Sequence, residues 1–329
     1  LSSRLFTECL AQVWHEKDII CLDVREVLIT DQNFNTARPN KELLKKNCQT
    51  KLFEAKDGAK VLVTQGFIGA SQNGLTTTLG RGGSDFSAAL LAWGAAADVL
   101  QIWTDVAGIA STDPRLCKDA KPISEITFSE ASELANFGAK ILHPATLSPA
   151  AEVNIPVFVG SSYEPNSCGT WISKETTSRP LIRAMAMRTD QTLLTITNPK
   201  MLQTCGFLFS IFKVFNDHKI SVDSITTSEI SVAMTLNGQV DQNISEEFIA
   251  ELSELGELQR EENLSLISLI GNKINHTPGL AARVFNSIPE INVRMICLGA
   301  SKHNFCFLVA SNVGKQAIQS LHQTFIGKE

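Results

Sequence analysis

The chain has 329 residues, of which 43% are hydrophobic and 19% charged, and its formal net charge is -5. This composition is that of a globular protein long enough for two or three domains. It argues against a basic nucleic-acid-binding face, and no apolar run reaches membrane-spanning length. The eight cysteines are scattered and form no C-x-x-C pair, which argues against a metal knuckle or a disulfide framework.

Strand and helix patterns alternate through residues 1–178. Strand-like apolar runs lie at 18–24, 61–65, 99–105 and 156–159, and helical patterns at 1–17, 41–54, 86–97, 129–137 and 144–152. Continuous apolar strands alternating with helices predict a three-layer α/β domain with a parallel sheet. Ligands of such sheets bind beyond the carboxyl ends of the strands, where Gly66, Gly69 and the Thr104-Asp105 pair fall. Residues 160–180 indicate an edge hairpin followed by a linker.

Beyond residue 190 the pattern becomes α+β. Expected helices lie at 206–219, 245–255, 278–287 and 314–325, and expected strands at 222–227, 230–236, 257–261, 266–270, 292–297 and 305–309. Two copies of a βαββαβ order predict paired ferredoxin-like modules. We expect a linker at 179–190, a first module at 191–262 and a second at 263–329, with the option that strand 191–197 pairs into the second module.

A glycine-rich turn stands between a predicted strand and a predicted helix. Residues 80–85 read GRGGSD. Such a turn presents bare N–H groups and the positive end of the helix dipole, and Arg81 adds a planar fork that suits a carboxylate. The turn therefore predicts an anion site, and the alternative is a tight turn with a surface arginine.

Five segments together resemble the aspartate kinases, in order and in spacing. They are 64–85 (TQGFIGASQNGLTTTLGRGGSD), 104–115 (TDVAGIASTDPR), 137–144 (FGAKILHP), 156–162 (PVFVGSS) and 220–235 (ISVDSITTSEISVAMT). The similarity is to the monofunctional, lysine-sensitive branch and covers essentially the whole chain. It implies an amino-acid-kinase-like domain followed by two ACT modules. The family's Lys-Phe-Gly-Gly-Thr-Ser and Gly-Glu-Arg elements are missing here, so we expect a fragment without the first part of the kinase domain, inactive alone.

The resemblance implies transfer of the γ-phosphoryl group of ATP, with Mg²⁺, to the side-chain carboxylate of L-aspartate. This is the first step toward lysine, threonine and methionine. The acceptor carboxylate is already ionised near neutral pH, so the chemistry needs positioning and positive charge rather than a general base. We assign no catalytic residue and no metal ligand. The implied substrate-binding residues are Arg81, Gly82, Gly83, Ser84 and Asp85.

Nucleotide contacts are also implied by the resemblance. The positions are Thr104, Asp105, Ala110, Arg115, Lys140 and Ile141. Many relatives carry a tyrosine where this chain has Ala110, which puts adenine packing in doubt. Without the family, residues 112–115 would be a turn around a proline and Lys140 a solvated lysine.

An allosteric lysine site is the third implication. Its residues are Met201, Thr204, Phe207, Leu208, Ser221, Val222, Asp223, Ser228 and Glu229. The start of the helix near Phe207 would take the effector carboxylate, and Asp223 its ammonium group. The alternatives are ordinary core for the methionine and phenylalanine and a solvated strand end for Asp223. ACT modules usually pair across subunits, so we expect a homodimer and allow a tetramer.

Two other functions remain open from the sequence. One is a catalytically inactive ACT-type amino-acid sensor, and the other is another carboxylate kinase of the same superfamily, acting for example on glutamate. Threonine or methionine could replace lysine as effector. We expect no nucleic-acid or membrane partner and a cytoplasmic location, with a plastid as the alternative.

Overall fold

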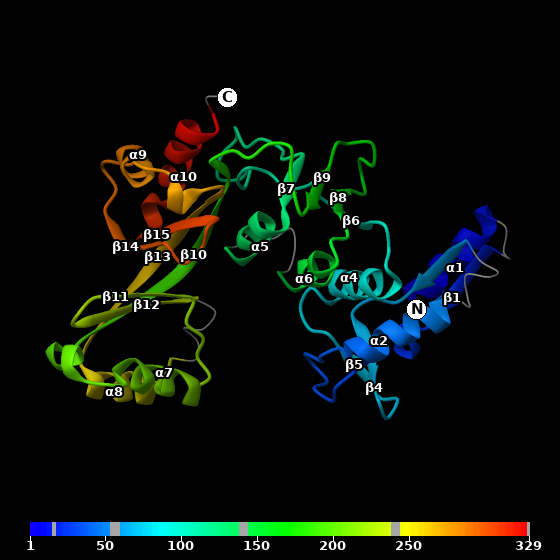
Figure 1. The fold of residues 1–329 in the computed structure, drawn as a ribbon, viewed down its shortest axis with the longest axis horizontal. Coiled ribbons are helices and arrows are strands. Elements are labelled where there is room, and N and C mark those ends of the chain that lie inside the picture. The colour runs from blue at the N-terminus through cyan, green and yellow to red at the C-terminus, as the bar shows by residue number, and fades with distance from the viewer. Residues whose placement is uncertain (15–17, 53–59, 138–143, 238–243, 328–329) are drawn as a thin grey trace. The chain divides into compact units, whose positions relative to one another are not determined.

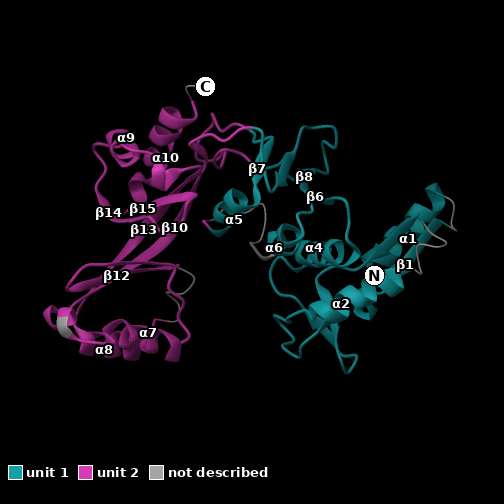
Figure 2. Ribbon diagram, viewed as in Figure 1, with its two compact units in different colours: residues 1–109, 122–136, 140–177 teal, residues 110–121, 137–139, 178–329 magenta. Residues whose placement is uncertain are grey.

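The computed structural model describes residues 1–14, 18–52, 60–137, 144–237 and 244–327 (Figure 1). The chain divides into two compact units (Figure 2). Unit 1 comprises residues 1–109, 122–136 and 140–177, and unit 2 comprises 110–121, 137–139 and 178–329. The boundary is therefore not a single cut, because two short segments from within the predicted kinase domain belong to unit 2.

Unit 1 has α/β architecture with small mixed sheets. Its helices are α1 (Ser2–Val13), α2 (Lys41–Asn47), α4 (Gly83–Ala95), α5 (Phe128–Asn136) and α6 (Pro144–Glu152). Its strands are β1 (Ile19–Leu22), β2 (Ile29–Thr30), β3 (Val61–Thr64), β4 (Ile68–Ser71), β5 (Thr76–Thr78), β6 (Leu100–Thr104), β7 (Glu125–Thr127), β8 (Val157–Ser161) and β9 (Thr170–Ser173). The predicted strands β1, β3, β6 and β8 are confirmed.

Pairing in unit 1 is parallel for the predicted strands and mixed for the short strands beside them, because β2–β4 and β7–β9 are also parallel. Strand β1 runs parallel to β3, and β6 parallel to β8. The short strands β5 and β9 then add antiparallel partners to β4 and β8. The α/β class is confirmed, but the two larger sheets of unit 1 are mixed rather than wholly parallel, because β5 and β9 join them in the antiparallel direction. Neither short strand stands out in the sequence as a continuous apolar run.

Unit 2 is built on one six-stranded antiparallel sheet, in the order β11-β12-β10-β13-β15-β14. Its strands are β10 (Ile182–Thr197), β11 (Ser224–Thr227), β12 (Ser231–Asn237), β13 (Glu257–Gly271), β14 (Val293–Leu298) and β15 (Asn304–Ala310). Its helices are α7 (Phe207–Asp217), α8 (Glu246–Leu255), α9 (Leu280–Asn286) and α10 (Ser311–Phe325). The Ser245 side chain caps α8 by accepting a hydrogen bond from the Phe248 amide.

The two modules share the two central strands. Residues 191–197 of β10 pair with β12 and with 257–264 of β13, whereas residues 182–188 pair with 266–271. Asp190 and Asn263 have φ angles of 58° and 57°, so each long strand changes conformation where it passes from one module to the next.

This sharing corrects the predicted boundaries. The expected linker over 179–190 is mostly strand, because β10 begins at Ile182. It is also 182–188, not 191–197, that pairs into the second module. Finally, the two strands expected at 257–261 and 266–270 are one continuous strand, β13. Sequence periodicity does not reveal which partner a strand has, and here one strand serves both modules.

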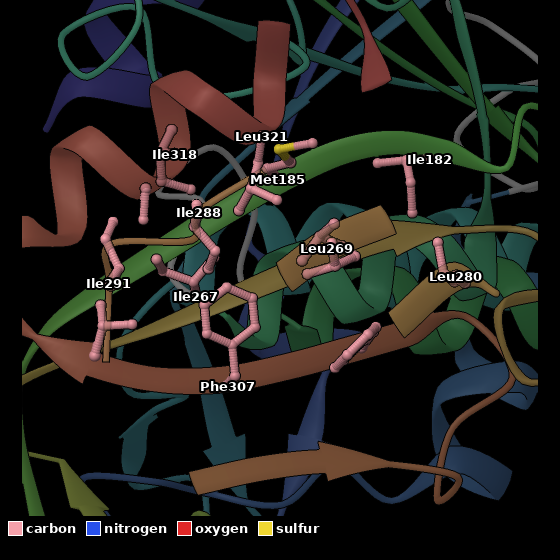
Figure 3. Packing of buried hydrophobic residues seen from close by; sticks show 14 of the residues in the cluster. Ile182, Met185, Ile267, Leu269, Leu280, Ile288, Ile291, Phe307, Ile318 and Leu321 are labelled. Atoms are coloured by element: carbon pink, nitrogen blue, oxygen red, sulfur yellow. The ribbon is translucent and has the colours of Figure 1, made fainter. Parts of the chain in front are cut away.

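Each module has its own hydrophobic core. The first encloses Phe207, Ile211, Phe215, Phe248 and neighbours beneath α7 and α8. The second encloses residues of β10, β13, β15 and α10, including the labelled Met185, Ile267, Phe307, Ile318 and Leu321 of Figure 3. Among the described residues, no helix combines the length and the apolar character needed to cross a bilayer.

Candidate functional site

The glycine turn before α4 has a fixed backbone geometry. Gly82, the N-cap residue, has φ 72° and ψ 13°, in the left-handed region that glycine adopts without steric cost. The Gly83 amide donates to the carbonyl of Gly80 at 3.1 Å. A Cβ at Gly83 would lie 2.8 Å from Cδ2 of Phe67, so only glycine fits between this turn and its neighbour.

The buried hydroxyl of Ser87 ties this turn to the segment after β3. Its oxygen accepts the Phe67 amide at 2.8 Å, and it donates to the carbonyl of Gly83 at 2.6 Å. A Cβ at Gly66 would lie only 3.1 Å from Cα of Ser84. The two loops are therefore in close backbone contact, and the start of α4 is held rigidly.

Arg81 stands at this rigid helix start with its side chain exposed, and so does Ser84. Within the described ranges, Arg81 has no ion-pair partner. Asp85 lies in the first turn of α4, where a carboxylate is favoured by the helix dipole. An exposed guanidinium beside the amide groups of a helix start can bind a carboxylate through two parallel hydrogen bonds.

Thr104 ends strand β6 beside Ser161 at the end of β8, and Asp105 directly follows Thr104. The Thr104 hydroxyl donates to Oδ1 of Asp105 at 3.1 Å. The carbonyl of Thr104 accepts both the amide and the hydroxyl of Ser162, at 2.8 and 2.9 Å. Because β6 and β8 are parallel, their carboxyl ends form one polar edge, the position where ligands of such sheets bind.

The remaining predicted nucleotide contacts do not join this edge within unit 1. Ala110 and Arg115 belong to unit 2, and Lys140 and Ile141 lie outside the described residues. Arg115 forms a bidentate pair with Asp113, at 2.6 Å between Nη2 and Oδ2, with its side chain 75% exposed. The hydrogen bonds to Asp113 raise the pKa of Arg115, which keeps it cationic.

The predicted effector helix α7 also starts at a left-handed glycine, Gly206, with φ 80°. The preceding 3₁₀ turn (Pro199–Gln203) carries Met201, and the Thr204 hydroxyl donates to the carbonyl of Lys200 at 2.8 Å. Phe207 is buried in the core of the first module, and Met201 packs against that core. The ordinary-core alternative therefore describes these two side chains well, whereas Leu208 is exposed.

Asp223 is the half-buried carboxylate of this region. Its amide donates to the carbonyl of Thr235 at 2.9 Å, and its Oδ2 lies 2.7 Å from Nη2 of Arg188. Burial raises the pKa of Asp223, and the charge of Arg188 opposes that rise. The solvated-strand-end alternative does not hold, because the Asp223 side chain is only 24% exposed and is paired.

The other predicted effector residues flank β11, two before it and two after it. Ser221 is exposed, Val222 packs against the first core, and Ser228 and Glu229 form the turn after β11. The Ser228 hydroxyl is 2.6 Å from that of Ser231. The four extended residues of β11 separate Asp223 from Ser228, which places the two roughly 16 Å apart, so one small ligand cannot contact both within one chain.

A cavity of about 410 Å³ adjoins Asp223, and sequence reasoning did not predict it. Its lining residues are Phe137, Phe212, Val222, Asp223, Ser224, Ile225, Cys297, Gly299, Ala300, Ser301, Asn304 and Cys306. Cys297 and Cys306 face each other across β14 and β15, and a hydrogen bond from Cys306 lowers the pKa of Cys297 to about 6. The lining residues come from both modules and from Phe137, so no single motif indicated the cavity. Among the described residues, no cluster of three metal-ligating side chains occurs.

Comparison with known families defines the class of protein. Residues 4–161 match the amino acid kinase family, and residues 267–325 match the ACT domain. The chain therefore joins an amino acid kinase region to an ACT-containing region, as the two architectures indicate.

The particular family follows from full-length relatives. The chain is 46% identical to lysine-sensitive aspartokinase 3 of Escherichia coli strain K12, over 98% of this chain and 72% of that protein. Two crystal structures of E. coli aspartokinase III superpose with TM-scores of 0.85 and 0.82 at 46% identity, covering 98% of this chain and 73% and 74% of theirs. The first is a complex with aspartate and ADP (R-state), and the second a complex with lysine and aspartate (T-state). The chain belongs to the aspartokinase family and is a kinase.

Proposed function

We propose that the protein transfers the γ-phosphoryl group of ATP to the side-chain carboxylate of L-aspartate, forming 4-phospho-L-aspartate. The observation that carries this proposal is Arg81 at the start of α4. An exposed guanidinium there stands on a turn that Gly83 and Ser87 hold rigid. Arg81 would bind the α-carboxylate of aspartate through two hydrogen bonds and leave the side-chain carboxylate free to attack the γ-phosphoryl group.

The nucleotide would lie beside the polar edge formed by Thr104 and Asp105. Transfer between a carboxylate and a triphosphate brings like charges together, so positive groups must stabilise the transferring phosphoryl group. Arg115, kept cationic by Asp113, and Lys140 are the residues we propose for this task. Mg²⁺ would arrive with ATP, since this ion binds phosphate oxygens and water in preference to a protein cage.

We further propose feedback inhibition by lysine in the first ACT module. The T-state relative contains lysine, and in this chain the start of α7 and Asp223 offer groups for a carboxylate and an ammonium. Because Asp223 and Ser228 are too far apart for one ligand, the site would be completed by a second copy of the chain, which supports a homodimer. The reaction would open the route to lysine, threonine and methionine, in the cytoplasm or a plastid.

The test is direct detection of the acyl phosphate. Because we expect these 329 residues alone to be inactive, the assay uses a protein that also carries the Lys-Phe-Gly-Gly-Thr-Ser and Gly-Glu-Arg elements of the family. This protein, ATP, Mg²⁺ and L-aspartate are incubated with hydroxylamine, which converts an acyl phosphate to a coloured hydroxamate. We expect product with aspartate, much less with glutamate, and less when lysine is added. Product with glutamate alone would favour another carboxylate kinase. Lysine binding without product from either substrate would favour the amino-acid sensor.

A further inference from the structure

Residues 110–121 form a closed loop whose ends are joined by hydrogen bonds. The Ser111 amide donates to the carbonyl of Lys121 at 2.8 Å, and the Lys121 amide donates to Oγ of Ser111 at 2.9 Å. The carbonyl of Ser111 accepts the amide of Met185 in β10 at 2.7 Å. The segment is thus fastened to the sheet of the second module, and it carries Arg115.

The last part of α10 holds the same loop through three polar contacts. Nε2 of His322 lies 2.9 Å from Oγ of Ser111, Gln319 donates to the carbonyl of Leu116 at 2.9 Å, and Lys121 donates to the carbonyl of Ile326 at 2.8 Å. Gln319 and His322 recur on one face of α10, and Ile326 directly follows its last residue. Ile318 and Leu321 of α10 point instead into the apolar core (Figure 3).

The contact between His322 and Ser111 is the buried centre of this arrangement. The two residues are 1% and 2% exposed. The oxygen of Ser111 already accepts the Lys121 amide, so its own hydrogen is available to donate to Nε2 of a neutral imidazole. Burial lowers the pKa of His322, Lys121 adds to that effect and Asp119 opposes it, which keeps the imidazole neutral near pH 7.

Burying a polar pair of this kind costs desolvation free energy that an apolar pair would not cost. An apolar side chain at position 322 would fill this buried site without desolvating a ring nitrogen, whereas the imidazole needs a hydrogen-bond partner. The partner of His322 is Ser111, whose hydrogen bonds with Lys121 join the two ends of the loop that carries Arg115. A guanidinium that binds a phosphate needs a rigid supporting loop, because a misplacement of about 1 Å can lower the reaction rate about 100-fold.

We propose that His322 is a positioning residue for the nucleotide. Through Ser111 it fixes the loop over 112–120, and with it the direction in which Arg115 and Asp113 face. The second ACT module then contributes to holding the loop that carries Arg115 and is not only a regulatory attachment. This inference rests on the proposed role of Arg115 in binding the nucleotide.

The test compares four variants by calorimetry with Mg²⁺-ADP and, separately, with L-aspartate. His322→Leu removes the hydrogen bond and keeps an apolar fill, His322→Gln keeps a polar group in reach of Ser111, and Arg115→Ala removes the guanidinium. Gln316→Ala is the matched control, because Gln316 is exposed on the same helix. Thermal unfolding of each variant establishes that it is folded, and hydrogen exchange of residues 111–121 reports the loop itself.

The expected result is an ADP affinity about tenfold weaker in His322→Leu, which corresponds to 1.4 kcal/mol, with unchanged aspartate affinity. His322→Gln should recover most of this loss, Gln316→Ala should behave as the parent, and exchange should accelerate in 111–121 of His322→Leu. A folded His322→Leu with parental ADP affinity, while Arg115→Ala loses it, would overturn the positioning role alone. Parental ADP affinity in Arg115→Ala, or a parent that binds no ADP, would overturn the nucleotide role of Arg115 and this inference with it.

Discussion

Two helices of this protein begin in the same way and are surrounded very differently. Both α4 and α7 start after a glycine in the left-handed region, Gly82 at φ 72° and Gly206 at φ 80°. At the start of α4 the next residue, Gly83, is pressed against Phe67, and Arg81 adds a cation. At Gly206 an added Cβ would meet no atom within 4 Å, and the charged groups of the predicted effector set are carboxylates, Asp223 and Glu229.

The difference shows how the same local structure, a helix that starts after a left-handed glycine, can suit two ligands, the proposed substrate and the proposed effector. The proposed substrate must be held with its α-carboxylate fixed while another carboxylate reacts, and a rigid, cationic turn suits that task. The proposed effector must enter and leave, and an open helix start together with an acidic side chain in the same module suits a molecule with both a carboxylate and an ammonium. The following predictions test this division, from the largest expected effect to the smallest.

Replacing Arg81 with alanine should have the largest effect. Loss of a bidentate, charge-assisted contact should lower kcat/KM for aspartate about 100- to 1000-fold. Lysine affinity should stay at the parental value, because Arg81 belongs to the α4 start alone. Steady-state kinetics in the hydroxamate assay measure the first effect and calorimetry the second. An Arg81→Ala variant with parental aspartate kinetics would remove the basis of the proposed substrate site.

Replacing Asp223 with asparagine should have the next largest effect. The side chain keeps its shape and loses the charge that would meet the effector ammonium, so lysine affinity should fall about 10- to 100-fold. The lysine concentration that halves activity should rise by the same factor, with the uninhibited rate unchanged. Lysine titrations of parent and variant measure both quantities. Unchanged inhibition would show that Asp223 does not contact the effector.

One glycine at each helix start, Gly83 as the first residue of α4 and Gly206 just before α7, can be replaced with alanine and the two effects compared. Gly83→Ala places a methyl group 2.8 Å from Cδ2 of Phe67. It should cost about 1–3 kcal/mol of unfolding free energy through overpacking, and aspartate affinity with it. Gly206→Ala meets open space and should cost only about 1–2 kcal/mol for the left-handed backbone. Chemical denaturation of the two variants checks the order, and equal losses would contradict the contrast between a tight and an open turn.

The smallest expected effect is a pH dependence set by α10. Burial lowers the pKa of His322 below its ordinary value of 6.5, so the unfolded chain takes up this proton at a higher pH than the folded one. Stability from this group should be complete above about pH 6.5 and fall as pH drops toward the folded pKa. The raised pKa of Asp223 acts with the opposite sign at lower pH. The unfolding free energies of the parent and of His322→Gln, measured by denaturation between pH 5 and 8, should depend on pH with different slopes. The same pH dependence in both would contradict the neutral imidazole.

How much the sequence could predict depended on how local each feature is. The glycine turn, the strand ends at Thr104 and Asp105, and the helices α7 and α10 follow from patterns of ten or so residues, and they were located correctly. The length of β10 was missed because its two halves pair in different modules across Asp190. The contact of Ser111 with His322 joins residues 211 apart, and the partner of Asp223, Arg188, lies in a segment interpreted as linker. No spacing signal exists for such contacts, because they depend on the folded chain.

The most direct test of the account is a two-by-two calorimetric titration, in which L-aspartate and L-lysine are each titrated into Arg81→Ala and Asp223→Asn. The account predicts that Arg81→Ala loses the heat of aspartate binding and keeps that of lysine, and that Asp223→Asn does the reverse. Loss of both heats in either folded variant would contradict the claim that the two helix starts hold different ligands.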